Sequence, residues 1–155
     1  MSKFISKPHV ELLNFTKSRV NKAHVLDLSG KLLTYFRRNK GLRKKLKCSE
    51  IALTVVIIGR NKAKELNKKF RKKDFATDVL SFEQKGSRMG LGELVLCDSV
   101  VRRQAVEHKL SFTQEMDYLL IHGFLHLLGY DHEKSRRAEL IMMRLQEKLF
   151  RRWRV

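Results

Sequence analysis

The segment HGFLHLLGYDH, residues 122–132, limits the possible folds of this chain more than any other part of the sequence. Its histidines follow the spacing H-x3-H-x5-H, so His122 and His126 lie one turn apart on the same face of a helix. A continuous helix would carry His132 to a different face, because an α-helix has about 3.6 residues per turn. Gly129 stands where a residue in the left-handed conformation would end the helix. The pattern predicts that the helix stops there and that a turn returns His132 to the other two histidines.

Apolar residues surround these histidines, so the helix is expected to be buried. A single imidazole on such a helix is most often a core histidine bonded to a carbonyl, because a buried polar group needs a partner. Three imidazoles at this spacing favour a metal site instead, and we predict that His122, His126 and His132 hold one Zn²⁺ ion. Ni²⁺ is another ion that imidazole suits. Three protein ligands are typical of a catalytic zinc site and four of a structural one, so Asp131 as a fourth ligand is the alternative.

The same spacing matches HExxHxxGxxH, the zinc signature of the metzincin proteases, including its glycine. The general-base glutamate of that signature falls here on Gly123. Without this carboxylate the usual water-activating base of peptide hydrolysis is missing, although a bound metal can still lower the pKa of water. The site is therefore expected to be zincin-like in geometry, and a metallopeptidase is the less favoured interpretation.

Positive charge dominates the composition, with 34 Lys and Arg against 16 Asp and Glu and a formal net charge of +18. The basic residues concentrate in residues 37–47, 60–73 and 151–155. A surface of this sign attracts polyanions, and three such segments favour RNA or DNA as a partner over a merely solvated basic surface. An anionic membrane surface is disfavoured because no strongly apolar face accompanies the basic segments.

The chain shows no apolar run long enough to cross a membrane and no apolar signal core near its first residue, so we expect a cytoplasmic protein. Cys48 and Cys97 are far apart and form no CxxC pattern. They are expected to be free thiols, one or both buried, because a reducing compartment disfavours disulfides.

Hydrophobic periodicity predicts a single α+β domain, residues 1–155, in which helices pack on a small sheet. Short apolar segments predict strands, and the short link between the second and third favours antiparallel neighbours. The predicted strands are 51–58, 77–83 and 93–97. The predicted helices are 25–38, 61–70, 99–110, 111–129 and 133–153. In these helices the residues expected to face inward include Ala63, Leu66, Phe70, Leu140, Met143, Leu145 and Leu149.

Three segments together resemble one known family, the YbeY endoribonucleases. HGFLHLLGYDH resembles the family signature HGxLHLxGYDH. ELNKKFRKKDFATDVLSF, residues 65–82, resembles its LNxxYRxKDxPTDVLSF segment, and GLGELVLC resembles its LGDIxI segment. Phe70, Ala76 and Glu93 depart from the family pattern, where tyrosine, proline and aspartate are common. The three segments occur in the expected order, which makes the resemblance specific.

The resemblance implies a mixed sheet of about four strands with packed helices and a metzincin-like zinc site beside it. It also implies zinc-dependent cleavage of single-stranded RNA, in maturation of the small-subunit ribosomal RNA 3′ end and ribosome biogenesis. The implied partners are single-stranded rRNA and ribosomal particles, with no membrane and no small-molecule cofactor. The conserved arginine of the family falls on Arg71, and a guanidinium near the zinc would bind the phosphate and stabilise its transition-state charge.

Two questions stay open at this stage. A non-catalytic RNA-binding or ribosome-binding module with a structural zinc fits the positive charge as well as a nuclease does. Asp78 has three candidate roles: a cap of a helix or turn, an ion-pair partner of Arg71, or an acceptor for a ligand histidine. Thr77 and Ser81 are expected to be structural hydroxyls. His24 carries no pattern, and His108 is expected at the surface.

Overall fold

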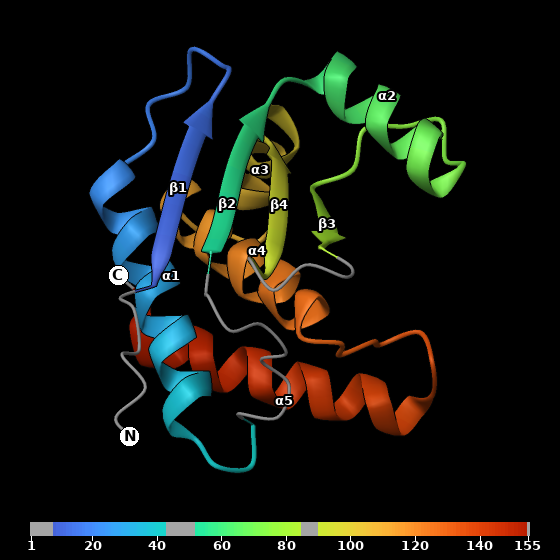
Figure 1. Cartoon of the computed structure of the whole chain (residues 1–155). Helices are drawn as coiled ribbons and strands as arrows, with labels where there is room; N and C mark the ends of the chain where they lie inside the picture. The colour runs from blue at the N-terminus through green and yellow to red at the C-terminus, as the bar shows by residue number, and fades with distance from the viewer. Residues whose placement is uncertain (1–7, 43–51, 85–89, 155) are drawn as a thin grey trace.

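Four strands and five helices make up the part of the chain that the computed structural model describes, residues 8–42, 52–84 and 90–154 (Figure 1). The α+β fold with a four-stranded mixed sheet is confirmed. In chain order the elements are β1 (His9–Asn14), α1 (Lys22–Arg38), β2 (Ala52–Ile58), α2 (Arg60–Arg71), β3 (Val79–Glu83), β4 (Gly92–Cys97), α3 (Asp98–Glu107), α4 (Phe112–Leu127) and α5 (Arg136–Trp153).

The sheet has the strand order β1-β2-β4-β3. β2 lies in the interior and runs parallel to both of its neighbours, as expected of its continuous apolar sequence. β3 and β4 are antiparallel, which confirms the pairing predicted from their short link. The sequence did not predict β1. It is an edge strand that buries only Leu12, so it lacks the alternating pattern of a half-buried strand.

One face of the sheet carries the main core. α4 packs on β3 and β4 and also contacts α1, α3 and α5 (Figure 1). α1 buries an apolar face that includes Leu28, Leu32 and Phe36, and the ring centroids of Phe36 and of Phe124 on α4 lie 5.4 Å apart. Complete burial of a side chain of this size contributes roughly 1.5–3 kcal/mol. The central position of α4 in this core fixes the backbone that carries two of the three predicted ligands.

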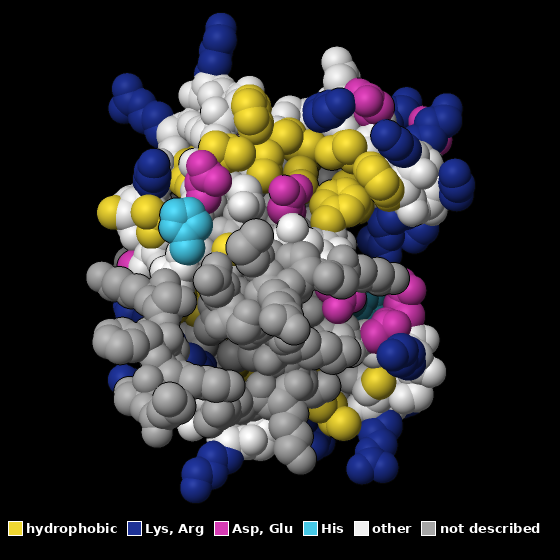
Figure 2. Space-filling view, in the orientation of Figure 1, with side chains coloured by type: hydrophobic (Ala, Val, Ile, Leu, Met, Phe, Trp, Pro, Cys, Tyr) yellow, Lys and Arg dark blue, Asp and Glu magenta, His cyan; other side chains and the backbone are white. Residues whose placement is uncertain are grey.

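The opposite face of the sheet is only partly covered. α2 and α3 meet it at one end, where Ile58, Val95 and Val100 belong to a smaller apolar cluster. In the orientation of Figure 1, hydrophobic side chains gather over this part of the sheet and Lys and Arg side chains stand around α2 (Figure 2). Cys97 is a buried free thiol on this face, and Cys48 lies outside the described residues. Residues 85–89, in the short link between β3 and β4, also lie outside them.

Two helices turn a different face inward from the one predicted. In α2, Ala63 is buried but Phe70 is 53% exposed, and the buried position is taken by Asn67, whose side chain donates to the Phe75 carbonyl at 2.8 Å. The prediction for Phe70 was therefore wrong. The helical pattern placed the apolar Phe70 inward, but the polar Asn67 is buried instead because its side chain satisfies a loop carbonyl.

α5 shows a similar difference. It buries Met142, Gln146 and Leu149, whereas Leu140 and Met143 are partly exposed. Apolar residues occur on several sides of this helix, and the buried Gln146 interrupts the stripe that faces α4. Among the described residues no helix combines the length and the apolar character needed to span a membrane.

Candidate metal centre

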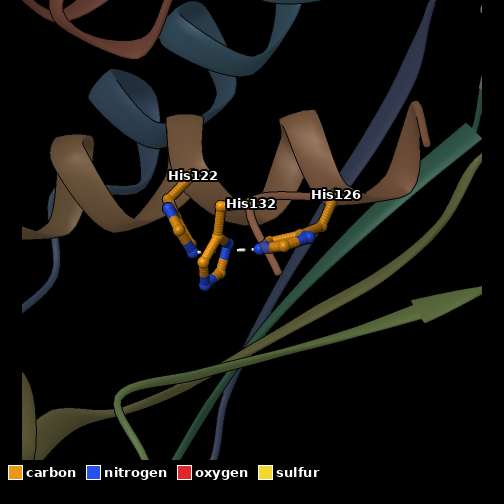
Figure 3. Close-up of side chains that lie close together, drawn as sticks. All are labelled: His122, His126 and His132. Atoms are coloured by element: carbon orange, nitrogen blue, oxygen red, sulfur yellow. Dashed lines mark hydrogen bonds between the residues drawn. The ribbon is translucent and has the colours of Figure 1, made fainter. Parts of the chain in front are cut away.

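The three histidines of residues 122–132 meet beside α4. His122 and His126 project from the last turns of the helix, and His132 returns from the turn that follows it (Figure 3). The Nε2 atoms of His122 and His126 are 3.1 Å apart. One nitrogen from each of the three rings lies within 4.8 Å of the others, a group that could hold a metal ion. The structure thus brings together all three residues that the sequence predicted as ligands.

Local backbone signals place the turn. α4 begins with a capping box in which Ser111 and Gln114 bond each other's backbone N–H groups. At the other end Gly129 has φ +88°, and Tyr130 N–H donates to the Leu125 carbonyl at 3.0 Å. A Cβ at Gly129 would meet nothing within 4 Å, so the glycine is required by its backbone conformation and not by lack of space. The predicted helix end at Gly129 is confirmed.

Gly123 lies where α4 approaches the sheet most closely. A Cβ on Gly123 would stand 2.8 Å from Leu94 Cδ2 and 3.2 Å from Ser81 Oγ. The Ser81 hydroxyl donates to the Gly123 carbonyl at 3.2 Å, which agrees with the structural role expected for it. The position that carries the general base of metzincin proteases therefore has no room for a glutamate side chain in this packing. This geometry argues against peptide hydrolysis.

Gln146 orients His122. Its Oε1 lies 2.9 Å from Nδ1 of His122, and because an amide oxygen only accepts, His122 Nδ1 carries the proton. The neutral ring then presents the lone pair of Nε2 to the other histidines, which is the arrangement a metal ligand needs. Gln146 was not predicted from the sequence. The signal that could have found it is a lone polar residue on a helix face shared with Met142 and Leu149.

Burial favours the uncharged form of two of these imidazoles, His122 and His126, because it lowers the pKa of each. Burial, together with the smaller effects of the nearby His122 and His132, lowers the pKa of His126 to about 4. Burial also lowers the pKa of His122, while the hydrogen bond to Gln146 acts in the opposite direction. His132 Nδ1 is buried and has no hydrogen-bond partner among the described residues. Neutral rings and a buried nitrogen without a partner suit coordination of a cation.

The histidines open into a hollow of about 780 Å³. Arg71, the last residue of α2, lines this hollow together with His122, His126 and His132. Lys73 and Glu133 line it as well. A fixed positive charge and a group of nitrogens that could hold a metal ion thus face one solvent-accessible space.

The two acidic candidates have other partners. Asp131 is not part of the three-histidine group, and its Oδ1 accepts the Glu133 N–H at 2.9 Å. Asp78 Oδ1 accepts the Val79 N–H at 2.7 Å, and its Oδ2 accepts a hydrogen bond from the Gln104 side chain at 3.2 Å. Of the roles considered for Asp78, capping the turn before β3 is the one these contacts show.

Two further histidines have functions in packing. His24 Nε2 contacts the buried carboxylate of Asp117 at 2.8 Å, and His108 Nδ1 contacts that of Glu115 at 2.8 Å. Both carboxylates belong to the first half of α4 and are almost completely buried. The side chain of His108 is half exposed, in line with its predicted position at the surface, but it also covers the buried carboxylate of Glu115.

The fold and this site define a small α+β protein with a three-histidine group of the kind that binds a metal ion. The sequence model of the family described as Endoribonuclease YbeY matches residues 12–154, and the chain belongs to this family. The resemblance noted in the sequence is therefore confirmed.

Individual relatives agree with this assignment. The chain is 40% identical to Endoribonuclease YbeY of Bdellovibrio bacteriovorus over 141 residues, which cover 91% of this chain and 92% of that protein. It is also 40% identical to Endoribonuclease YbeY of Thermodesulfovibrio yellowstonii over 103 residues, 64% of this chain and 65% of that protein. A solution structure of a protein from Thermotoga maritima superposes with a TM-score of 0.61 at 28% identity, covering 93% of this chain and 88% of the other.

Proposed function

We propose that this chain is a zinc-dependent endoribonuclease that cleaves single-stranded ribosomal RNA. The proposed setting is ribosome biogenesis in the cytoplasm, with ribosomal particles as partners and the 3′ end of the small-subunit rRNA as the substrate region. The observation that carries the proposal is that Arg71 and the three-histidine group face the same hollow. The name Endoribonuclease YbeY, borne by a relative that matches 91% of this chain, supports it.

The residues present fit one zinc ion. His122, His126 and His132 would hold it, since three imidazoles with nitrogens within 4.8 Å of one another match the donor chemistry of Zn²⁺. A bound zinc supplies Lewis-acid polarisation of a phosphate oxygen or an activated water. Gln146 keeps His122 in the tautomer that can act as a ligand.

Arg71 supplies the positive charge for the phosphate. Its guanidinium would bind non-bridging oxygens of the scissile phosphodiester and stabilise the negative charge that accumulates there in the transition state. The basic residues of α2 would hold the neighbouring phosphates, so binding should weaken steeply as salt rises. Thus α4 and the turn that follows it would provide the metal ligands, and α2 would provide the anion-binding groups.

Cleavage of a labelled single-stranded RNA, taken from the 3′ end of small-subunit rRNA, tests the proposal. The purified chain with zinc should cleave this strand and leave a duplex of the same sequence intact. Chelation of the metal and the substitution His126→Ala should each reduce cleavage to the level of a protein-free sample. His9→Ala, which changes an exposed histidine on β1, is the matched control and should cleave at the wild-type rate.

Two results would overturn the proposal in different ways. Cleavage that persists both after chelation and in His126→Ala would show that the histidines are not responsible. Binding of zinc and RNA without turnover would favour the alternative of a non-catalytic ribosome-binding module with a structural zinc.

A further inference from the structure

A second hollow, of about 740 Å³, lies on the partly covered face of the sheet. Strand alternation builds its floor: Val56 pairs with Val95, and Phe82 pairs with Glu93, in the register of β2, β4 and β3. Its walls come from the loop after β1 and from α2. The wall residues are Phe15, Lys62, Leu66 and Phe70. The lining is mostly apolar and aromatic.

Phe70 joins this hollow to the histidine hollow. Both Phe70 and Phe82 line the two hollows, so the aromatic pair forms the boundary between them. The two rings are 5.0 Å apart at an interplanar angle of 72°, an edge-to-face contact that leaves Phe70 53% exposed. Phe70 precedes Arg71, so the exposed ring stands next to the cation proposed to bind the scissile phosphate.

The charge around the second hollow differs from its interior. α2 carries six basic residues, Arg60, Lys62, Lys64, Lys68, Lys69 and Arg71, against one acid, Glu65. Lys69 Nζ lies 5.3 Å from the centroid of the Phe70 ring, and Arg71 and Lys73 line the adjoining hollow. A ligand of this hollow would therefore be attracted by positive charge at the rim and would meet an apolar and aromatic surface inside. A single-stranded polynucleotide matches both parts of this surface: its phosphates can contact the basic rim, and its flat, weakly polar bases can enter the apolar interior.

We propose that Phe70 stacks on a nucleobase next to the scissile phosphate and that the apolar hollow between β2, β4 and α2 receives that base. This inference rests on the proposed endoribonuclease function and adds a subsite to it. The Glu93 carboxylate in the same hollow can accept hydrogen bonds from the N–H groups of a base and repels a phosphate, so it favours the base as the part that enters. Phe82 supports the Phe70 ring from its edge.

Stacking on an aromatic side chain has a characteristic signature. It requires a base and tolerates every base, because each has a π-face. It also explains a preference for single strands, since the bases of a duplex are already stacked and paired. A peptide has no backbone phosphates, so it would not make the contacts with the basic residues of α2 that a polynucleotide would make.

Fluorescence anisotropy of the full chain with labelled strands at fixed salt tests the subsite. One probe is an oligouridine and the other a strand of equal length in which every base is absent. The wild-type chain should bind the base-bearing strand more tightly. Phe70→Ala should weaken its binding about 5- to 150-fold and leave binding of the abasic strand unchanged. Phe70→Tyr keeps a ring and should bind as the wild type does.

The matched control is Phe75→Ala. Phe75 is 55% exposed, nearly the same as Phe70, but lines neither hollow, so its removal should change neither probe. Equal affinity of the wild-type chain for the two probes, or equal effects of Phe70→Ala and Phe75→Ala, would overturn the proposal and would favour a protein contact for this face. Failure of the proposed function would look different: the base-dependent binding would remain, but no strand would be cut.

Discussion

The two sides of the histidine hollow are built in opposite ways. α4 lies in the centre of the core, and most of its residues are buried. α2 buries only Ala63 and Asn67 and presents its remaining side chains to solvent or to the partly covered sheet face. The difference corresponds to two physical tasks: metal ligands must be held with sub-ångström precision, whereas attraction of a polyanion needs charge at a surface. Changes on the α2 side should therefore affect turnover and RNA binding, and changes on the α4 side should affect metal affinity and stability.

The largest expected effect comes from the α2 side. Arg71→Ala removes the guanidinium that lines the histidine hollow, and kcat should fall about 10²–10³-fold because the charge on the transition state loses its proposed partner. Zinc content and the free energy of unfolding should not change. Lys68→Ala, an exposed neighbour on the same helix, is the control for general loss of charge. A loss of bound zinc in Arg71→Ala would contradict the division between the two sides.

The next effect tests the α4 side. Gln146→Leu removes the acceptor that fixes His122 and should weaken zinc binding about 10–100-fold. Competition with a chromophoric chelator measures this affinity. Anisotropy of the oligouridine probe should stay at its wild-type value, because the basic rim of α2 is intact. Glu147→Gln alters the adjacent, more exposed residue and should leave both quantities unchanged. Unchanged zinc affinity in Gln146→Leu would show that this hydrogen bond does not position the ligand.

A pair of identical substitutions compares the core with the periphery. Gly123→Ala forces a Cβ against Leu94 and should lower the free energy of unfolding by about 1–3 kcal/mol. Gly30→Ala, in the middle of α1 with nothing within 4 Å of the new Cβ, should raise it by up to about 1 kcal/mol. Urea titration followed by circular dichroism gives both values. Equal signs would mean that α4 is not packed as closely on the sheet as described.

The smallest effect concerns pH. Burial raises the pKa of Asp117 above its ordinary value of 3.8, against the opposing hydrogen bond from His24. The folded chain therefore holds this proton more tightly, a contribution to stability that is present below pH 3.8 and is lost as the pH rises through the raised pKa. Asp117→Asn has no carboxyl proton to lose, so its free energy of unfolding relative to wild type should increase as the pH rises through the raised pKa of Asp117.

Urea titrations of the two chains at successive pH values, from about pH 4 to about pH 6, measure this difference. A difference that stays constant would show that Asp117 has the same pKa in the folded and unfolded chain. Zinc affinity at neutral pH should be the same for both chains, because the histidine end of α4 is held by packing and not by the charge at its other end.

The sequence predicted the elements whose signals are local. The spacing of His122 and His126, the left-handed Gly129 and the continuous apolar run of β2 each act within a few residues, and the structure shows all three as expected. The edge strand β1 escaped prediction because a single buried residue, Leu12, gives no periodicity.

Features that depend on packing between distant segments could not be obtained in this way. The buried face of α5 depends on which of several apolar stripes meets α4, and the position of Gln146 beside His122 follows only from that choice. Phe70 points outward because Asn67 satisfies a loop carbonyl that no helical pattern contains. Arg71 was assigned a role through family resemblance alone, since nothing local distinguishes it from its basic neighbours.

The glycine turn after α4 also determines how ion uptake relates to folding. All three imidazoles come from one short stretch of chain, so an ion bound by them would close only a small loop. Such a loop removes little entropy from the unfolded chain and therefore adds little to the stability of the fold. The sheet and the cluster around Phe36 and Phe124 would gain no cross-link from it. The metal-free chain is therefore expected to stay folded, so that an ion could bind after folding is complete.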